Sequence, residues 1–347
     1  MKKTLLPTIL LLITIGILNH ATAQIGGNAT YKFLSLPSSP RIAAMGGDFL
    51  AIDDSDINLA LANPSLINSN MNNQLSLNFV DYFADINYGV VSYGREFEKY
   101  GSFVGSVQYI DYGTFTYAND AGETSGNFRA GETALIVGWG RQLDSAFSIG
   151  ANFKSIFSSL ESYRSFGLAV DVAGSYRTSE GLLISLVARN IGTQLVAYES
   201  GRREPLPFDL QLGLSKRLEH VPFRYSILLT NLHKWDLTYD DPTKVKTDPF
   251  TGEEIKEDKF MSILDKTMRH VVVGAEFLPT NNFSLRLGYN YHMRQELKVD
   301  SKISTVGFSW GFGFRISRFQ FNYARKAYHL VGSPNFISIS TNLSEFL

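Results

Sequence analysis

The chain has 347 residues, with 32 lysines and arginines against 33 aspartates and glutamates, and it contains no cysteine. A formal net charge of −1 lacks the basic surplus that nucleic-acid binding requires, so we expect no nucleic-acid partner. The absence of cysteine excludes disulfides, thiolate metal sites and cysteine nucleophiles. Charged residues make up only 19% and aromatic residues 13%, which is typical of a barrel whose outer surface faces lipid.

The first 23 residues have the pattern of an export signal. Lys2 and Lys3 precede an apolar stretch, 5–18, and Ala21-Thr22-Ala23 forms a small-x-small cleavage site. The apolar stretch is shorter than the roughly 20 residues that a membrane-spanning helix needs, which disfavours an uncleaved anchor. We therefore expect residues 1–23 to be a signal peptide that is cleaved after Ala23 during export.

Residues 24–73 show no strand pattern and are expected to form a plug inside a barrel. Asp54-Ser55-Asp56 precedes a short apolar run, and Asn63-Pro64 follows it, which predicts a short helix with an acidic cap. The same acidic run could bind calcium, but it lacks the glycine and the distal glutamate of an EF-hand loop. The apolar residues of this segment favour insertion into the lumen over a free tail.

From residue 74 onwards, apolar residues alternate with polar or small ones, as in strands with one apolar face. Phe208, Leu210, Leu212 and Leu214 give the clearest example. Fourteen strands are predicted, at 74–81, 85–95, 101–111, 131–141, 145–157, 166–177, 181–191, 207–217, 222–231, 269–278, 282–292, 303–315, 318–326 and 335–345. Most have the length of about 9–11 residues that a tilted strand needs to cross a membrane.

The connections between these strands alternate between short turns and long loops, with one exception at the first hairpin. Such alternation is the outer-membrane arrangement, with turns in the periplasm and loops outside the cell. The sequence therefore predicts an all-β fold. It is a fourteen-stranded antiparallel transmembrane β-barrel over 74–347 in the cell outer membrane, with an N-terminal plug over 24–73.

Candidate catalytic residues are few and isolated. Gly307-Phe308-Ser309-Trp310-Gly311 matches the G-x-S-x-G nucleophile pattern, but this pattern works only on a strained strand-to-helix turn. Here Ser309 lies inside a predicted strand, on the face that carries small residues. The histidines show no metal-ligand spacing. We therefore expect no enzymatic activity, no cofactor and no metal.

Three long connections are expected outside the cell, at 112–130, 192–206 and 232–270. Aromatic residues on a polar rim are typical anchors of protein interfaces. The candidate partner-binding residues are Phe115, Tyr117, Trp235, Tyr239 and Phe250. Membership of an aromatic girdle at the headgroup level is the alternative, and it suits Trp235 better than Phe250.

The start of the expected mature chain resembles a known family. The matching residues are Gly26-Gly27-Asn28-Ala29-Thr30-Tyr31-Lys32-Phe33-Leu34, then 41–47, and then Asn63-Pro64-Ser65-Leu66. They are similar to the PorQ family of the Bacteroidota type IX secretion system, and more loosely to PorV and the fatty-acid-transporter barrels. The resemblance implies a fourteen-stranded barrel with a plug. It also implies a non-enzymatic anchor for PorZ that works with PorU and PorV, in a complex that processes cargo and attaches it to lipopolysaccharide.

A second function stays open beside the anchor, namely a transporter that passes hydrophobic small molecules through the barrel wall. Several charged residues fall on inward positions, among them Arg189, Arg224, Glu276 and Arg286. A polar lumen disfavours an apolar conduit, but it does not exclude one, because a lateral opening leaves no pattern in the sequence.

Overall fold

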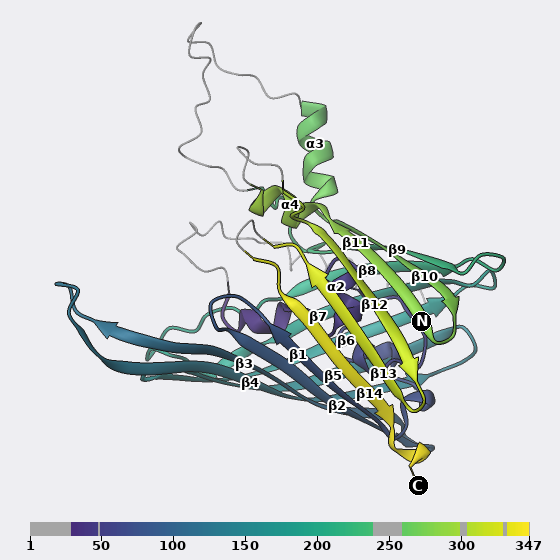
Figure 1. Ribbon diagram of the computed structural model, residues 1–347, viewed down its shortest axis with the longest axis horizontal. Helices are drawn as coiled ribbons and strands as arrows, with labels where there is room; N and C mark the ends of the chain where they lie inside the picture. Colours follow the sequence, from purple (N-terminus) through teal and green to yellow (C-terminus); the bar gives the residue numbers. More distant parts are fainter. Residues whose placement is uncertain (1–28, 48, 239–258, 299–303, 329–331, 347) are drawn as a thin grey trace, which may run out of the picture.

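Fourteen antiparallel strands close into a barrel in the computed structural model, which describes residues 29–47, 49–238, 259–298, 304–328 and 332–346 (Figure 1). Each strand pairs with its neighbours along the chain, and the first strand pairs with the last. The strands are β1 (Gln74–Asp81), β2 (Asn87–Phe97), β3 (Gly101–Ala118), β4 (Thr124–Gln142), β5 (Phe147–Leu160), β6 (Tyr163–Arg177), β7 (Leu182–Val196), β8 (Asp209–Arg217), β9 (Phe223–Leu229), β10 (Val271–Thr280), β11 (Phe283–Asn290), β12 (Phe308–Ile316), β13 (Phe319–Lys326) and β14 (Asn335–Asn342). The predicted fourteen-stranded barrel is confirmed.

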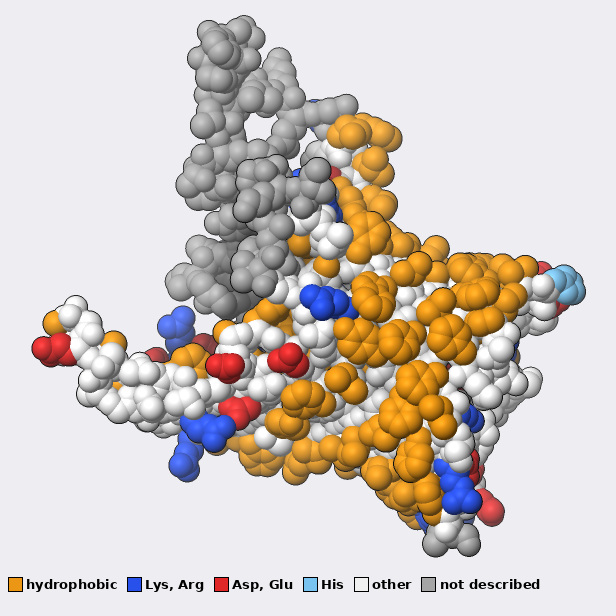
Figure 2. Space-filling model, viewed as in Figure 1, with side chains coloured by type: hydrophobic (Ala, Val, Ile, Leu, Met, Phe, Trp, Pro, Cys, Tyr) orange, Lys and Arg blue, Asp and Glu red, His pale blue; other side chains and the backbone are white. Residues whose placement is uncertain are grey.

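The alternation of the sequence corresponds to the two faces of the wall. In β8, Gln211 and Ser215 are buried in the lumen, whereas Leu212 and Leu214 are half-buried on the outside. Hydrophobic side chains cover the outer surface over β11 to β14 (Figure 2). Closure pairs each strand with a neighbour on both sides, which satisfies most backbone groups of the wall within the sheet, as the hydrocarbon interior of a membrane requires.

At one end of the barrel all connections are short. The long connections lie at the other end, as the sequence predicts, but that end also carries the short turns 82–86, 119–123 and 161–162. We call these ends the short-turn end and the long-loop end. β1 begins and β14 ends at the short-turn end, and the β3–β4 hairpin projects from the long-loop end (Figure 1).

The β3–β4 hairpin corrects the predicted loop at 112–130. β3 continues to Ala118 and β4 starts at Thr124, so only a tight turn separates them. Phe115 lies opposite Phe128, and their stacked rings are 5.2 Å apart between centroids. Both faces of this extension are exposed to solvent. Apolar alternation therefore disappears although the strand pairing continues.

The helices differ from prediction. The acidic run starts only a 3-10 turn, Ile57–Leu59, with Asp56 accepting a hydrogen bond from the backbone N–H of Asn58. Three helices were not predicted: α2 (Pro40–Ala44), α3 (Lys259–Met268) and α4 (Tyr291–Leu297). Further 3-10 turns are Lys32–Ser35, Pro64–Leu66, Ser69–Met71 and Leu343–Glu345. Among the described residues, no helix is long and apolar enough to cross a membrane.

The N-terminal segment, here residues 29–47 and 49–73, runs through the lumen from the long-loop end to the start of β1. Its apolar side chains are almost fully buried, with Ile42, Met45 and Ile52 at 3% exposure or less. Inward glycines of the wall let its backbone approach closely. A side chain at Gly150 would collide with the carbonyl of Pro64, and one at Gly288 would collide with the backbone of Met45 and Gly46.

Candidate functional site

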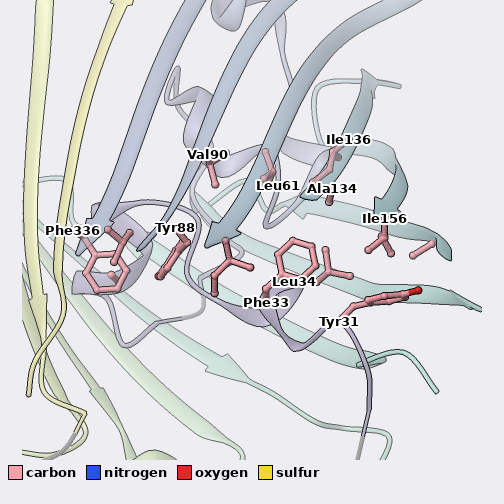
Figure 3. Packing of buried hydrophobic residues seen from close by; sticks show 14 of the residues in the cluster. Tyr31, Phe33, Leu34, Leu61, Tyr88, Val90, Ala134, Ile136, Ile156 and Phe336 are labelled. Carbon is pink, nitrogen blue, oxygen red and sulfur yellow. The ribbon is translucent and has the colours of Figure 1, made fainter. Parts of the chain in front are cut away.

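An apolar cluster fills the lumen at the long-loop end (Figure 3). Tyr31, Phe33 and Leu34 of the N-terminal segment are each 2% exposed, and they meet inward side chains of the wall. Wall members include Val80, Tyr88, Val90, Ile110, Ile136, Ile156 and Phe336, and Leu206 joins from the connection after β7. We call this set the inner apolar cluster. Burying each large side chain contributes roughly 1.5–3 kcal/mol, so the cluster fixes this end of the segment.

Polar groups of the wall satisfy the inserted backbone around this cluster. The side-chain amide of Gln108 donates to the carbonyl of Phe33 at 2.9 Å, and the guanidinium of Arg189 donates to the carbonyl of Leu34 at 3.3 Å. The hydroxyl of Tyr88 donates to the carbonyl of Pro37 at 3.2 Å. The segment therefore lies in the lumen without leaving these carbonyls unpaired.

A tyrosine pair closes the long-loop side of the cluster. Tyr112 donates to Glu132 at 2.5 Å, and Tyr198 donates to Ser158 at 2.5 Å. Burial raises the pKa of Tyr198 to about 12, and the nearby Glu132 carboxylate adds to that shift. Tyr198 is therefore neutral and a hydrogen-bond donor at physiological pH.

A second cluster, at mid-barrel, consists of six ionised groups. Its members are Arg41, Asp54 and Asp56 of the N-terminal segment and Arg224, Glu276 and Arg286 of the wall. We call it the charge cluster. Glu276 is fully buried and accepts from Arg41 Nε at 2.9 Å, from Arg224 Nη1 at 2.7 Å and from Arg286 Nε at 2.9 Å. Three arginines face three carboxylates, so the charges of the cluster balance, and Asp54, whose side chain is 32% exposed, lies at its edge.

Arg41 links the plug to the wall in this cluster. Its guanidinium also donates to Asp54 at 2.8 Å and to Asp56 at 3.1 Å. Burial by itself raises the pKa of Asp54, but the charge of Arg41 overrides this and holds the pKa below its ordinary value. These acids are thus neutralised by arginine, and no group of three His, Asp or Glu side chains in the described residues could hold a metal ion.

The wall is incompletely paired beside the inner apolar cluster. β8 pairs with β7 only from Leu182 to Arg189, whereas β7 continues to Val196. No strand of the described chain pairs with 190–196 on this side. We call 190–196 the open edge of β7.

Only a few hydrogen bonds join the connection 197–208 to the open edge. The backbone N–H of Glu204 donates to the side chain of Gln194 at 2.7 Å, and the side chain of Asn190 donates to the carbonyl of Pro207 at 2.9 Å. Thr30 of the N-terminal segment donates to the carbonyl of Pro205 at 2.9 Å. Opening this side would break few backbone bonds.

Apolar side chains lie on both sides of this connection. Leu206 is 6% exposed and belongs to the inner apolar cluster, whereas Phe208 is 39% exposed on the outer surface. Ile191 and Leu195 of the open edge also face outwards. An apolar surface therefore leads from the lumen to the lipid side within a few residues.

A polar cavity of about 330 Å³ lies at the short-turn end. Its lining includes Asp53, Glu96, Arg141 and Arg177, and Arg177 forms an ion pair with Asp53. The lumen thus holds the inner apolar cluster at the long-loop end, the charge cluster at mid-barrel and a polar cavity at the short-turn end, with further apolar clusters of the N-terminal segment between them.

The three predicted partner-binding residues that the structure describes lie in two separate places. Phe115 and Tyr117 lie on the projecting β3–β4 hairpin, and Trp235 stacks on His270 beside the end of β9. Tyr239 and Phe250 lie outside the described residues. All three described residues are exposed, and their role in docking a partner stays a prediction.

Ser309 has a structural contact in the lumen. It is 2% exposed inside β12 and donates to the carbonyl of Ala44 at 2.9 Å. Inward positions of Arg224, Glu276 and Arg286 were predicted from alternation, but their contact with Arg41 was not. Arg41 is 235 residues from Glu276 in the chain, and nothing in the local pattern links them.

No family model and no curated protein matches the chain. Solved structures do match it. The chain is similar to the deltaS2 mutant of the TodX monoaromatic hydrocarbon channel, with a TM-score of 0.55 and 11% identity, over 89% of this chain and 99% of that one. It is also similar to the P. putida toluene transporter TodX, with a TM-score of 0.50, 11% identity and the same coverage of both chains. At this identity the matches establish the fold.

These comparisons overturn the main functional interpretation of the sequence. The matched structures are a hydrocarbon channel and a toluene transporter, rather than enzymes. The assignment as a type IX secretion anchor for PorZ is contradicted, and no finding supports membership of the PorQ family. The chain has the barrel fold of outer-membrane transporters, and the alternative interpretation as a transporter agrees better with these findings.

Proposed function

We propose that this protein is an outer-membrane transporter of hydrophobic small molecules. The observation that carries the proposal is the inner apolar cluster at the open edge of β7, in a barrel similar in fold to hydrocarbon channels. Residues 1–23 direct export, residues 24–73 form the plug, and the long-loop end faces the outside of the cell.

The proposed path begins at the long-loop end. A hydrophobic molecule takes the place of side chains of the inner apolar cluster, for which the N-terminal residues Tyr31 to Leu34 must move aside. It then passes Leu206 and leaves sideways between β7 and the connection 197–208 into the membrane. This route avoids the charge cluster, where an apolar molecule would separate buried ion pairs from their partners.

The plug explains why such a barrel would not leak ions. Arg41 and Glu276 join the N-terminal segment to the wall at mid-barrel, and Ser65 and Asn63 bond to it nearer the short-turn end. These contacts hold the plug across the lumen, and the proposed lateral route does not require them to break.

The test is uptake of radiolabelled toluene by cells that lack their own hydrocarbon channel. The cysteine-free chain allows a clean crosslink between Gln194→Cys and Glu204→Cys with a short thiol-cleavable reagent. We expect the wild-type chain to raise uptake, the crosslink to abolish the increase, and reduction to restore it.

The matched control joins Ser92→Cys to Ser106→Cys, which are directly opposite each other in the fully paired β2–β3 ladder. This crosslink should leave uptake unchanged. If cells that produce the wild-type chain take up no more toluene than cells without it, the proposed function is refuted. If both crosslinks act alike, the lateral route beside β7 is refuted.

A further inference from the structure

Helix α3 has its polar side turned towards the protein. Lys266 forms an ion pair with Asp236 at 2.6 Å, and Asp265 accepts from the hydroxyl of Tyr291 at 2.8 Å. The Lys266 contact lowers the pKa of Asp236, so this ion pair persists at neutral pH. These contacts fix the orientation of α3 on the rim formed by the residues after β9 and by α4.

The apolar side of α3 is turned outwards. Met261 and Ile263 are each 58% exposed and Leu264 is 44% exposed. At 3.6 residues per turn these three fall on one half of the helix, and Asp265 and Lys266 fall on the other. A helix on the surface of a water-soluble protein has the opposite orientation, with its apolar side against the core.

The wall beneath α3 is short. β9 has 7 residues and β11 has 8, whereas β10 between them has 10. A strand of seven residues tilted by about 45° rises only about 16 Å, whereas the apolar band of an outer-membrane barrel is about 25 Å tall. β9 and β11 by themselves therefore do not cover the hydrocarbon layer.

The apolar side of α3 continues the lipid-facing wall. In Figure 2 the hydrophobic side chains at the top of the molecule, where Figure 1 shows α3, extend towards those of the barrel wall. Outward residues of that wall include Val273, 40% exposed, and Leu287, 63% exposed. Trp235, beside the base of α3, is 60% exposed, as is usual for tryptophan at a membrane interface.

We propose that α3 is part of the membrane-contacting surface, and that its apolar side binds the acyl chains of the outer leaflet. The helix extends the apolar outer surface of the barrel above the short strands β9 and β11, and its polar side contacts the rim of the barrel. This inference depends only on the barrel lying in a membrane, and it holds whatever the barrel transports.

The experiment measures where a spin label on α3 lies. Ile263→Cys is labelled with a nitroxide in the full-length barrel, reconstituted in dimyristoyl phosphatidylcholine vesicles. Accessibility to oxygen, which concentrates in lipid, is compared with accessibility to a water-soluble nickel chelate. Leu287→Cys is the lipid-facing reference, and Glu123→Cys, in the exposed β3–β4 turn, is the water-facing reference. Heat-dependent gel mobility confirms that each labelled barrel is folded.

We expect the oxygen-to-nickel ratio at 263 to match that at 287 and to exceed that at 123 several-fold. A ratio equal to that at 123 would place α3 in water and overturn the proposal. Low accessibility to both reagents would mean that a second copy of the chain or another protein covers the helix, and would also overturn it.

Discussion

Glu276→Gln is the substitution that best tests how the plug is held. Glu276 is fully buried on β10 and accepts hydrogen bonds from three arginines at 2.7–3.1 Å, one of them Arg41 of the N-terminal segment. Glutamine has nearly the same shape but no charge. The substitution therefore leaves three arginines against Asp54 and Asp56, a buried net charge of +1.

The expected cost is about 3–5 kcal/mol of unfolding free energy, the usual range for removing one partner of a buried ion pair. A single unit-charge pair about 4 Å apart at an effective dielectric constant of 20 gives about 4 kcal/mol, which agrees with that range. The amide also places an N–H₂ group against guanidinium donors, so at least one of the lost hydrogen bonds is not replaced.

The measurements are the urea midpoint of the barrel refolded in vesicles and hydrogen exchange of the N-terminal segment. We expect a lower midpoint, and faster exchange over 30–56 than over the wall strands. Glu219→Gln, in the exposed turn between β8 and β9, is the control and should change neither quantity. Arg41→Gln should behave like Glu276→Gln, and the double variant should cost less than the sum, because both remove the same contact.

A wild-type midpoint in Glu276→Gln would refute this reasoning, because it would mean that the charge cluster contributes nothing to stability. Faster exchange confined to the wall around β10 would refute the narrower claim that Glu276 holds the plug.

Two further predictions follow from the lumen contacts. Because the folded-state pKa of Asp54 is depressed, its contribution to the free energy of unfolding is fully present above the unfolded pKa of about 3.9 and is lost as pH falls through the folded pKa. Hydrogen exchange of 30–56, corrected for its intrinsic pH dependence, should therefore stay slow at pH 7 and pH 5 and accelerate below about pH 4. Equal protection at pH 7 and pH 3 would contradict this prediction. Ser309→Ala removes one hydrogen bond to Ala44 and should lower the free energy of unfolding, measured by urea titration, by about 1 kcal/mol. Toluene uptake should stay unchanged, and loss of uptake by a normally inserted barrel would show that Ser309 has more than a structural contact.

The N-terminal motif and the fold of this chain point to different functions. The N-terminal motif residues, such as Asn63 and Ser65, resemble those of a secretion component. In the structure they make plug contacts, since the amide of Asn63 donates to the carbonyl of Leu50 and Ser65 bonds to Ser175 of the wall. Residues that hold a plug in a barrel say little about what the barrel transports or binds.

The sequence by itself determined the number of strands and the end of the barrel at which the long connections lie. This was possible because a barrel in lipid has two uniform environments, so each strand carries a period-two signal, as in Gln211 and Leu212. The signal failed where both faces of a strand are in water. That is why the extension of β3 to Ala118 was predicted as a loop.

Only the tertiary structure decided which distant residues meet in the lumen and on its rim. Arg41 meets Glu276 across 235 positions of the chain, and Tyr31 meets the wall beside the open edge of β7. The polar side of α3 is directed inwards by Asp236 and Tyr291, which lie on separate segments. Each of these arrangements depends on which strands become neighbours when the barrel closes and on how far each rises. No local period in the sequence records either property.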